Sequence, residues 1–317
     1  MDELRVAVVG AGRLGSLHAR KYAGLERVRL THVVDIDSPR ACEIAALHGA
    51  APLSDYRELA GKVAAASVAA PGSLHHEIAS YLLAQGIDVL LEKPMAASVH
   101  EARELGALAE RSARILQIGH LERFNPAILE LRRMVRAPRY IECLRVAPFT
   151  ERGTDVDVIL DLMVHDLDVI LSVTGAKVAS VEAIGVAVLT DQIDVANARL
   201  RFDDGLIANL NTSRVAPRRE RKIRLFQPDA YISVDYEARR IQLYRKSPPP
   251  AGGAWPEISA RQIDLDEGDP LGDEIAAFVG AVRTRRAPAV TALDGVRVME
   301  VSERIREAMR AEPGART

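Results

Sequence analysis

Apolar runs alternate with helix-like stretches along the first 119 residues of the chain. The apolar runs lie near 5–9, 28–34, 66–70, 87–91 and 115–118. Strands that alternate with helices in this way pair in a parallel sheet with helices on both faces. The pattern therefore predicts a doubly wound parallel α/β domain over residues 1–121. Its ligands are expected at the edge where the carboxyl ends of the strands meet.

The rest of the chain follows a different pattern, which begins with a predicted helix start at Asn125-Pro126. Several segments of period-two alternation follow without a helix between them: 178–189, 195–202, 206–213, 222–226, 231–236 and 240–244. Such alternation is typical of antiparallel strands with one buried face. Two closing helices are expected, one over 271–283 and one from Asp294, a predicted cap, to 309. We expect an α+β domain over 122–317 with an open, mainly antiparallel sheet.

A glycine-rich turn, Gly10–Gly15, directly follows the first apolar run. It reads Gly-Ala-Gly-Arg-Leu-Gly, and Asp35 follows after a further twenty residues. Between a strand and a helix, this spacing is that of the dinucleotide fingerprint, whose glycines permit a tight turn, a close pyrophosphate and a closely packed helix. The Asp35 carboxylate can accept hydrogen bonds from both ribose hydroxyls, which favours NAD. Arg40 lies close enough in sequence to leave NADP open.

A charged pair, Glu92-Lys93, ends the buried run 88–91 and is followed by Pro94. Pro94 restricts Lys93 to an extended backbone, which would direct the lysine over the sheet edge toward the nicotinamide. There the ammonium could hydrogen-bond the substrate oxygen and stabilise the negative charge that develops as an alcohol is oxidised. The other interpretation is a Lys93–Glu92 ion pair at a solvated strand end.

A predicted helix over 155–171 places Asp161, His165 and Asp168 on one face. Its other faces are apolar, so the helix is expected to be buried and its polar stripe to need partners. His165 could accept the hydroxyl proton while Asp161 orients its ring. A structural histidine held by Asp166 or Asp168 is the alternative. Asp161 and His165 could also ligate zinc, but no cysteine cluster or H-x-x-x-H pair completes a site, and we expect no metal.

Two further segments carry polar residues at expected ligand edges. Arg123 and Asn125, in Gly119–Pro126, are candidates for gripping substrate hydroxyls or phosphate. Alternatively Asn125 only caps a helix and Arg123 is solvated. After the third apolar run, His75 either approaches the cofactor or begins a surface helix.

Composition and charge narrow the possible partners. The chain has 317 residues, a net charge of −2 and 27% charged residues, so no overall basic excess argues for nucleic acid or an anionic membrane. A local basic run, Arg218–Arg224, could hold a diphosphate or form a solvated strand face. No signal-peptide pattern or membrane-spanning run is present in the sequence. Cys42, in a predicted helix, and Cys143, in a predicted strand, are far apart, so we expect a cytoplasmic protein without disulfides.

Together and in this order, these residues resemble the Gfo/Idh/MocA oxidoreductases. The likeness covers nearly the whole chain. It rests on the glycine turn, Pro71 with His75, Glu92-Lys93-Pro94, the helix with Asp161, His165 and Asp168, and Asp294-Gly295. The resemblance implies a Rossmann domain, a second domain with an open sheet, NAD or NADP, and redox chemistry at a sugar or cyclitol carbon. It also implies that Lys93 and His165 are catalytic and that Asp161 is the acidic residue one turn before the histidine.

Within the family, segments 119–126 and 162–168 look like the branch that oxidises the 3-hydroxyl of UDP-N-acetylglucosamine. A free-sugar or inositol-type dehydrogenase and a non-catalytic NAD-binding regulator remain alternatives. The exposed face of the second sheet suggests a homodimer or homotetramer. The expected cofactor contacts are Gly10, Gly12, Arg13, Leu14, Gly15, Asp35, Pro71, His75, Glu92 and Lys93. The expected substrate contacts are Lys93, Arg123, Asn125, Asp161 and His165, with phosphates also near 218–224.

Overall fold

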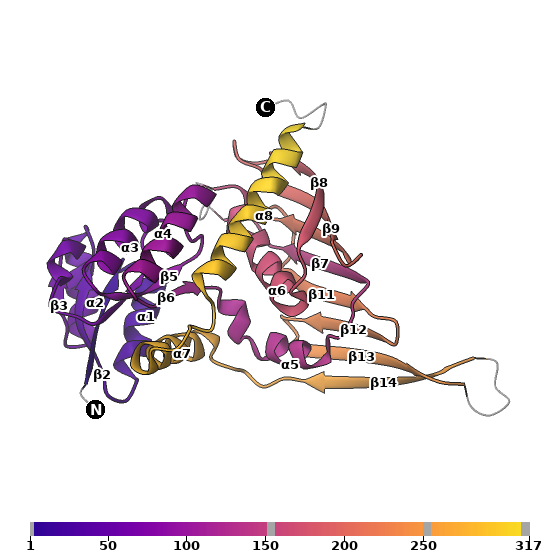
Figure 1. Ribbon diagram of the computed structural model, residues 1–317, viewed down its shortest axis with the longest axis horizontal. Coiled ribbons are helices and arrows are strands. Elements are labelled where there is room, and N and C mark those ends of the chain that lie inside the picture. Colours follow the sequence, from indigo (N-terminus) through magenta and orange to yellow (C-terminus); the bar gives the residue numbers. More distant parts are fainter. Residues whose placement is uncertain (1–2, 151–155, 250–254, 312–317) are drawn as a thin grey trace. The chain divides into compact units, whose positions relative to one another are not determined.

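The computed structural model describes residues 3–150, 156–249 and 255–311 (Figure 1). The chain forms two compact units. The first comprises Met1–Phe124 and Asp269–Met299, and the second comprises Asn125–Gly268 and Glu300–Thr317. Each unit is built on its own sheet.

The first unit contains a six-stranded sheet in the order β3-β2-β1-β4-β5-β6, and every pair of neighbouring strands is parallel. The predicted doubly wound parallel sheet is therefore confirmed. Its strands are β1 Leu4–Val9, β2 Val28–Val34, β3 Ala51–Leu53, β4 Ala65–Val68, β5 Asp88–Glu92 and β6 Leu116–Gly119. Its helices are α1 Arg13–Ala23, α2 Ser38–Leu47, α3 His75–Ala84, α4 Val99–Arg111 and α7 Pro270–Thr284, with short turns η1 Tyr56–Leu59, η2 Gly72–Leu74 and η3 Leu121–Phe124.

The helix α7 explains why a late segment of the chain belongs to the first unit. Ile275 and Phe278 of this helix are fully buried in the same core cluster as Val6 and Val8 of β1 and Tyr22 of α1. Burying this apolar stripe against the first sheet stabilises both elements. This differs from the expected division into 1–121 and 122–317, because an apolar stripe does not show which sheet will cover it.

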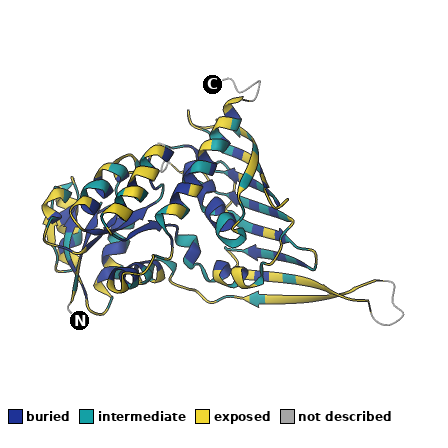
Figure 2. Ribbon diagram, in the orientation of Figure 1, coloured by how far each residue is buried: buried dark blue, intermediate teal, exposed yellow. Residues whose placement is uncertain are grey.

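The second unit contains an eight-stranded sheet in the order β14-β13-β12-β11-β7-β10-β9-β8. Only the β7–β10 pair is parallel, so the mainly antiparallel sheet is confirmed. Its strands are β7 Tyr140–Val146, β8 Val178–Val186, β9 Val195–Phe202, β10 Ile207–Ser213, β11 Glu220–Phe226, β12 Ala230–Asp235, β13 Arg240–Ser247 and β14 Glu257–Asp264. Its helical elements are α5 Pro126–Met134, the π-helical turn η4 Ile159–Met163 and α6 Val164–Thr174. Along the central strands, buried and more exposed positions alternate, so one face packs and the other stays open (Figure 2).

Two strands of this sheet lie outside the alternating segments expected over 178–244. The central strand β7 buries Ile141, Cys143 and Arg145 on one face, and the buried arginine breaks the apolar alternation. The strand β14 lies at the edge and is almost entirely exposed, so it has no apolar face to recognise.

The two helix starts that the sequence pointed to have different outcomes. Asn125 caps α5 by accepting the Ala127 N–H at 2.9 Å, as predicted. The last helix, α8 Ala292–Ala311, begins earlier than expected. Asp294 accepts from the Thr291 N–H and hydroxyl at 2.8 Å, and Thr291 accepts the Asp294 N–H at 3.2 Å. Thr291 is thus the cap, and Asp294 is its partner in a capping box. None of the helices in the described part of the chain has the length and apolar character needed to cross a membrane.

Candidate active site

The glycine turn after β1 leaves an open space at the start of α1. Gly10 has a φ of +93°, and a Cβ there would lie 2.6 Å from the Ala69 carbonyl oxygen. A Cβ on Gly15 would overlap the Gly10 carbonyl oxygen, so α1 packs directly on the turn. A Cβ on Gly12 would meet nothing within 4 Å. Because Gly12 is the N-cap and has no side chain, the first N–H groups of α1 face this space, where an anion can bind.

Asp35 is held at the end of β2 beside this turn. Its carboxylate accepts the Ala11 N–H at 2.7 Å and the Asp37 N–H at 2.9 Å. Arg40 forms an ion pair with Asp37 at 3.1 Å. The carboxylate oxygens of Asp35 are therefore held in place, and the Arg40 guanidinium is paired with Asp37.

A cavity of about 700 Å³ brings several of the expected cofactor residues together. Its lining includes Gly10, Gly12, Asp35, Arg40, Pro71 and Leu74. The volume lies within the usual range for small-molecule and cofactor sites. The lining joins the turn, the end of β2 and the segment after β4, as the ligand edge of a doubly wound sheet requires.

His75 begins α3 but is buried, so its expected alternative position on the surface is wrong. Its Nδ1 lies 2.7 Å from the Pro94 carbonyl oxygen and its Nε2 lies 2.9 Å from the Ala70 carbonyl oxygen. Burial lowers the pKa of His75 despite these two hydrogen-bonding oxygens. The ring thereby links the end of β4 to the segment that follows β5. Its contact with a cofactor stays a prediction.

Lys93 directly follows β5, every residue of which is buried. Glu92 does not lie at a solvated strand end, as one interpretation required, because its side chain is nine-tenths buried and binds His18. Lys93 itself is half-buried, and its N–H donates to the Glu92 carboxylate at 3.4 Å. The strand thus places a lysine at the same edge of the sheet as the glycine turn.

In the second unit, Asp161 and His165 lie on successive helical turns of different kinds. Asp161 belongs to the π-helical turn and His165 to the first turn of α6, and both are half-buried. Asp168 is fully buried. The expected α-helix over 155–171 is therefore interrupted, and its first residue lies outside the described part of the chain. Single π-helical turns are often found at functional sites.

Asp166 forms a buried ion pair that the sequence analysis missed. Arg145 of β7 donates to it twice, from Nε at 2.9 Å and from Nη2 at 2.8 Å. Both side chains are almost fully buried. The paired hydrogen bonds tie α6 to β7 and so set the position of His165, which is the next residue to Asp166. An arginine at an inward strand position was the signal in the sequence.

The remaining expected substrate residues have structural partners within their own units. Arg123 is buried, not solvated, and lies 3.5 Å from Asp294. In the basic run, Glu220 binds the well-exposed Arg218 at 2.6 Å and Lys222 at 3.3 Å, which favours the interpretation of a solvated strand face. Contacts of these residues and of Asn125 with a substrate stay predictions. So does the convergence of Lys93, in the first unit, with His165 in the second.

A single group of at least three neighbouring metal-ligating side chains is found among residues 3–150, 156–249 and 255–311. It consists of His18, Glu92 and Glu274, so the zinc interpretation of Asp161 and His165 gains no third ligand from the described residues.

The parallel sheet, the glycine turn and the fixed Asp35 define a dinucleotide-binding domain of the Rossmann type. Comparisons with known proteins identify the family. Residues 4–120 match the model of the oxidoreductase family with an NAD-binding Rossmann fold, and residues 135–233 match the GFO/IDH/MocA C-terminal domain. The chain belongs to the Gfo/Idh/MocA family and is a dehydrogenase with an NAD-binding Rossmann domain.

Individual relatives resemble the chain to different extents. It is 37% identical over 312 residues to a UDP-N-acetylglucosamine 3-dehydrogenase of Acidithiobacillus ferrooxidans, covering 98% of this chain and 99% of the relative. A solved structure of that enzyme superposes with a TM-score of 0.92 at 36% identity, covering 98% and 99% of the two chains. The myo-inositol dehydrogenase Hyg17 of Streptomyces leeuwenhoekii is 31% identical over 68% of this chain and 71% of its own. The fold is shared with GenD2 from gentamicin A biosynthesis, solved in complex with NAD, with a TM-score of 0.84, 21% identity and coverage of 98% and 95%.

Proposed function

We propose that the protein oxidises the 3-hydroxyl of a nucleotide sugar, UDP-N-acetylglucosamine, with NAD as the hydride acceptor. The observation that carries this proposal is the extent of the likeness to the Acidithiobacillus ferrooxidans enzyme, which spans 98% of this chain. The inositol 2-dehydrogenase of an Arthrobacter strain matches only 57% of the chain at 32% identity. A likeness that includes nearly the whole second unit favours a shared substrate over a shared cofactor domain alone.

The site residues support NAD as the cofactor. The fixed oxygens of Asp35 suit two ribose hydroxyls and would repel a 2′-phosphate. Arg40, the residue that could hold such a phosphate, is paired with Asp37. When bound, NAD supplies the acceptor for the hydride.

In the proposed mechanism, Lys93 donates a hydrogen bond to the substrate hydroxyl oxygen and lowers the cost of its developing negative charge. His165 accepts the hydroxyl proton, and Asp161 orients the imidazole and stabilises its charged form. With NAD held by the glycine turn and Asp35, the nicotinamide would accept the C3 hydrogen as a hydride as the O–H bond breaks, which would leave a 3-keto sugar. The hydroxyl proton stays on His165 and then passes to solvent, so the products are the ketone, NADH and one proton.

The test is NADH formation, followed by absorbance at a fixed enzyme concentration with separate substrates. UDP-N-acetylglucosamine should support turnover, while myo-inositol and free glucose should not. Turnover with inositol or glucose and none with the nucleotide sugar would assign the free-sugar alternative. Tight NAD binding without turnover of any of them would support the non-catalytic regulator.

We also propose that the protein self-associates as a homodimer or homotetramer through the open sheet of the second unit. On the strand β8, Ile184 and Val186 are each at least half exposed, and exposed apolar side chains on a sheet face are typical of an interface. Light scattering on the eluted protein should give two or four chain masses. A single chain mass at micromolar concentration would contradict this.

A further inference from the structure

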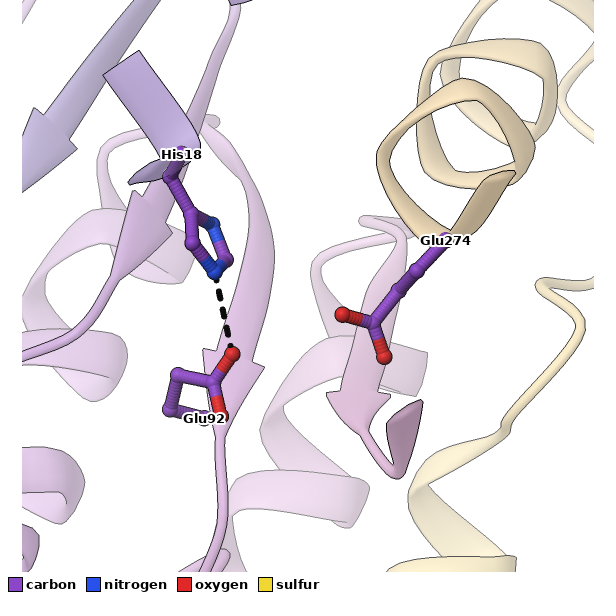
Figure 3. A group of neighbouring side chains, drawn as sticks. All are labelled: His18, Glu92 and Glu274. Carbon is purple, nitrogen blue, oxygen red and sulfur yellow. Dashed lines mark hydrogen bonds and ion pairs between the residues drawn. The ribbon is translucent and has the colours of Figure 1, made fainter. Parts of the chain in front are cut away.

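Three ionisable side chains lie buried beneath the turn that carries Lys93, and none of them transfers a proton or hydride in the proposed reaction. Glu92 was expected among the cofactor contacts, but its buried carboxylate binds His18 and the Lys93 N–H. They are His18 of α1, Glu92 at the end of β5 and Glu274 of α7 (Figure 3). His18 and Glu274 are fully buried, and Glu92 is 7% exposed. Their nitrogen and oxygen atoms lie within 4.8 Å of one another. Groups of this kind are costly to bury, so a specific role must compensate the cost.

Glu92 is held on several sides. One carboxylate oxygen accepts from His18 Nε2 at 3.1 Å, and the other accepts the Lys93 N–H at 3.4 Å. The carboxylate also lies against the backbone of Gly119 on β6, where a Cβ would come within 2.9 Å of it. These contacts restrict the Glu92 side chain. Because Lys93 is the next residue in the chain, they also restrict its backbone.

His18 connects this carboxylate to the helix that begins at the dinucleotide turn. It lies one helical turn after Gly15, on the buried face of α1. One turn further on, the Tyr22 hydroxyl binds the Ser67 hydroxyl of β4 at 2.7 Å. In the sheet, β4 separates β5 from β1, the strand that precedes α1. The His18–Glu92 hydrogen bond is thus a direct link from α1 to the turn that carries Lys93.

We propose that His18 and Glu92 are positioning residues, which fix the backbone of Lys93 relative to the helix that receives the cofactor phosphates. The inference rests on the proposed function, in which Lys93 hydrogen-bonds the substrate oxygen. A lysine displaced by about 1 Å can lose about a hundredfold in rate. The Glu274 carboxylate points from α7 toward this pair (Figure 3).

The variants Glu92→Gln and His18→Gln test this with kcat and KM measured separately. Both should lower kcat by about ten- to a hundredfold and leave the Kd for NAD and the KM for the sugar within about threefold of wild type. The matched control is Tyr22→Phe, which removes a buried hydrogen bond from the same helix without touching Glu92. It should keep the wild-type kcat. Equal losses in all three variants, in step with their melting temperatures, would overturn the proposal.

A double-mutant cycle separates positioning from general damage. In a Lys93→Met background, Glu92→Gln should cause no further loss of kcat, because its effect passes through Lys93. Multiplicative losses would refute the positioning role while leaving the catalytic role of Lys93 standing. Wild-type kcat in Lys93→Met alone would refute both proposals at once.

Metal analysis of the purified protein provides a further check, because one histidine and two glutamates also form a zinc-type donor set. If His18 and Glu92 are hydrogen-bonded to each other as the structure shows, the purified protein should contain less than about one-tenth of an equivalent of any divalent metal. A stoichiometric metal ion that is lost in His18→Gln would overturn the inference and assign the three side chains to a metal site.

Discussion

Replacing Arg145 with methionine should strongly destabilise the second unit. The substitution leaves the carboxylate of Asp166, which is 3% exposed, without the two hydrogen bonds at 2.8 and 2.9 Å that now neutralise it. Breaking a buried ion pair by removing one partner costs about 3–5 kcal/mol. That is a large share of the roughly 5–15 kcal/mol by which a folded domain is stable. Urea unfolding followed by circular dichroism should therefore show an earlier transition.

The matched control is Arg224→Met on the neighbouring strand β11. Arg224 pairs with Glu142 at 3.4 Å, but both side chains are well exposed, so its loss should cost no more than about 1 kcal/mol. The double variant Arg145→Met/Asp166→Leu replaces both charges with apolar groups and should recover most of the lost stability. If the unfolding free energy of Arg145→Met lies within about 1 kcal/mol of wild type, as that of Arg224→Met should, the ion pair does not hold α6 to β7.

Three further predictions follow from the sites. Asp35→Ser should raise the Kd for NAD by about ten- to a hundredfold, because charged hydrogen bonds contribute about 1.5–3 kcal/mol; an unchanged Kd in a cofactor titration would exclude the ribose contact. Gly119→Ala should lower kcat, since its Cβ would come 2.9 Å from the Glu92 carboxylate, whereas Gly106→Ala, with its nearest atom at 3.6 Å, should not; equal kinetics of the two variants would contradict this. Burial alone would raise the pKa of Asp194, but hydrogen bonds from Thr190, Leu189, Val188 and Arg214 hold it well below its ordinary value. The Asp194 carboxylate should therefore stabilise the folded state fully at pH values above its pKa in the unfolded chain, about 3.9. This stabilisation should be lost progressively as the pH falls below that value. Melting temperatures from pH 7 to 3 should fall less steeply for Asp194→Asn than for wild type, and parallel curves would refute the assignment.

The sequence predicted five of the six parallel strands of the first unit because they are mainly apolar, as strands covered on both faces must be, whereas the three-residue strand β3 was missed because it is short and largely exposed. It predicted the six strands β8 to β13 of the second sheet because they alternate in period two. Cys143 lies in a predicted strand, but the bounds of β7 were not predicted, because Arg145 occupies an inward position and its partner Asp166 comes from another element. The edge strand β14 was missed since nearly all its side chains are exposed.

The parts of the candidate site that are formed by residues close together in the sequence could be predicted. The parts that depend on contacts between residues far apart in the sequence could not. The glycine turn and Asp35 are recognisable from spacing alone, and the structure gathers them around one cavity. The His18–Glu92 bond joins residues 74 positions apart, and no local pattern reports such a pair. The π-helical turn at Asp161 was also missed, because it has the same apolar surroundings as an ordinary helix.

The central claim is that Lys93 and His165, from the two units, act on one substrate hydroxyl beside the bound cofactor. The most direct test is the kcat of Lys93→Met and His165→Asn with UDP-N-acetylglucosamine, measured alongside the Kd for NAD. The account predicts that each kcat falls by about a hundredfold or more while each Kd stays within about threefold of wild type. A wild-type kcat in either variant would contradict it.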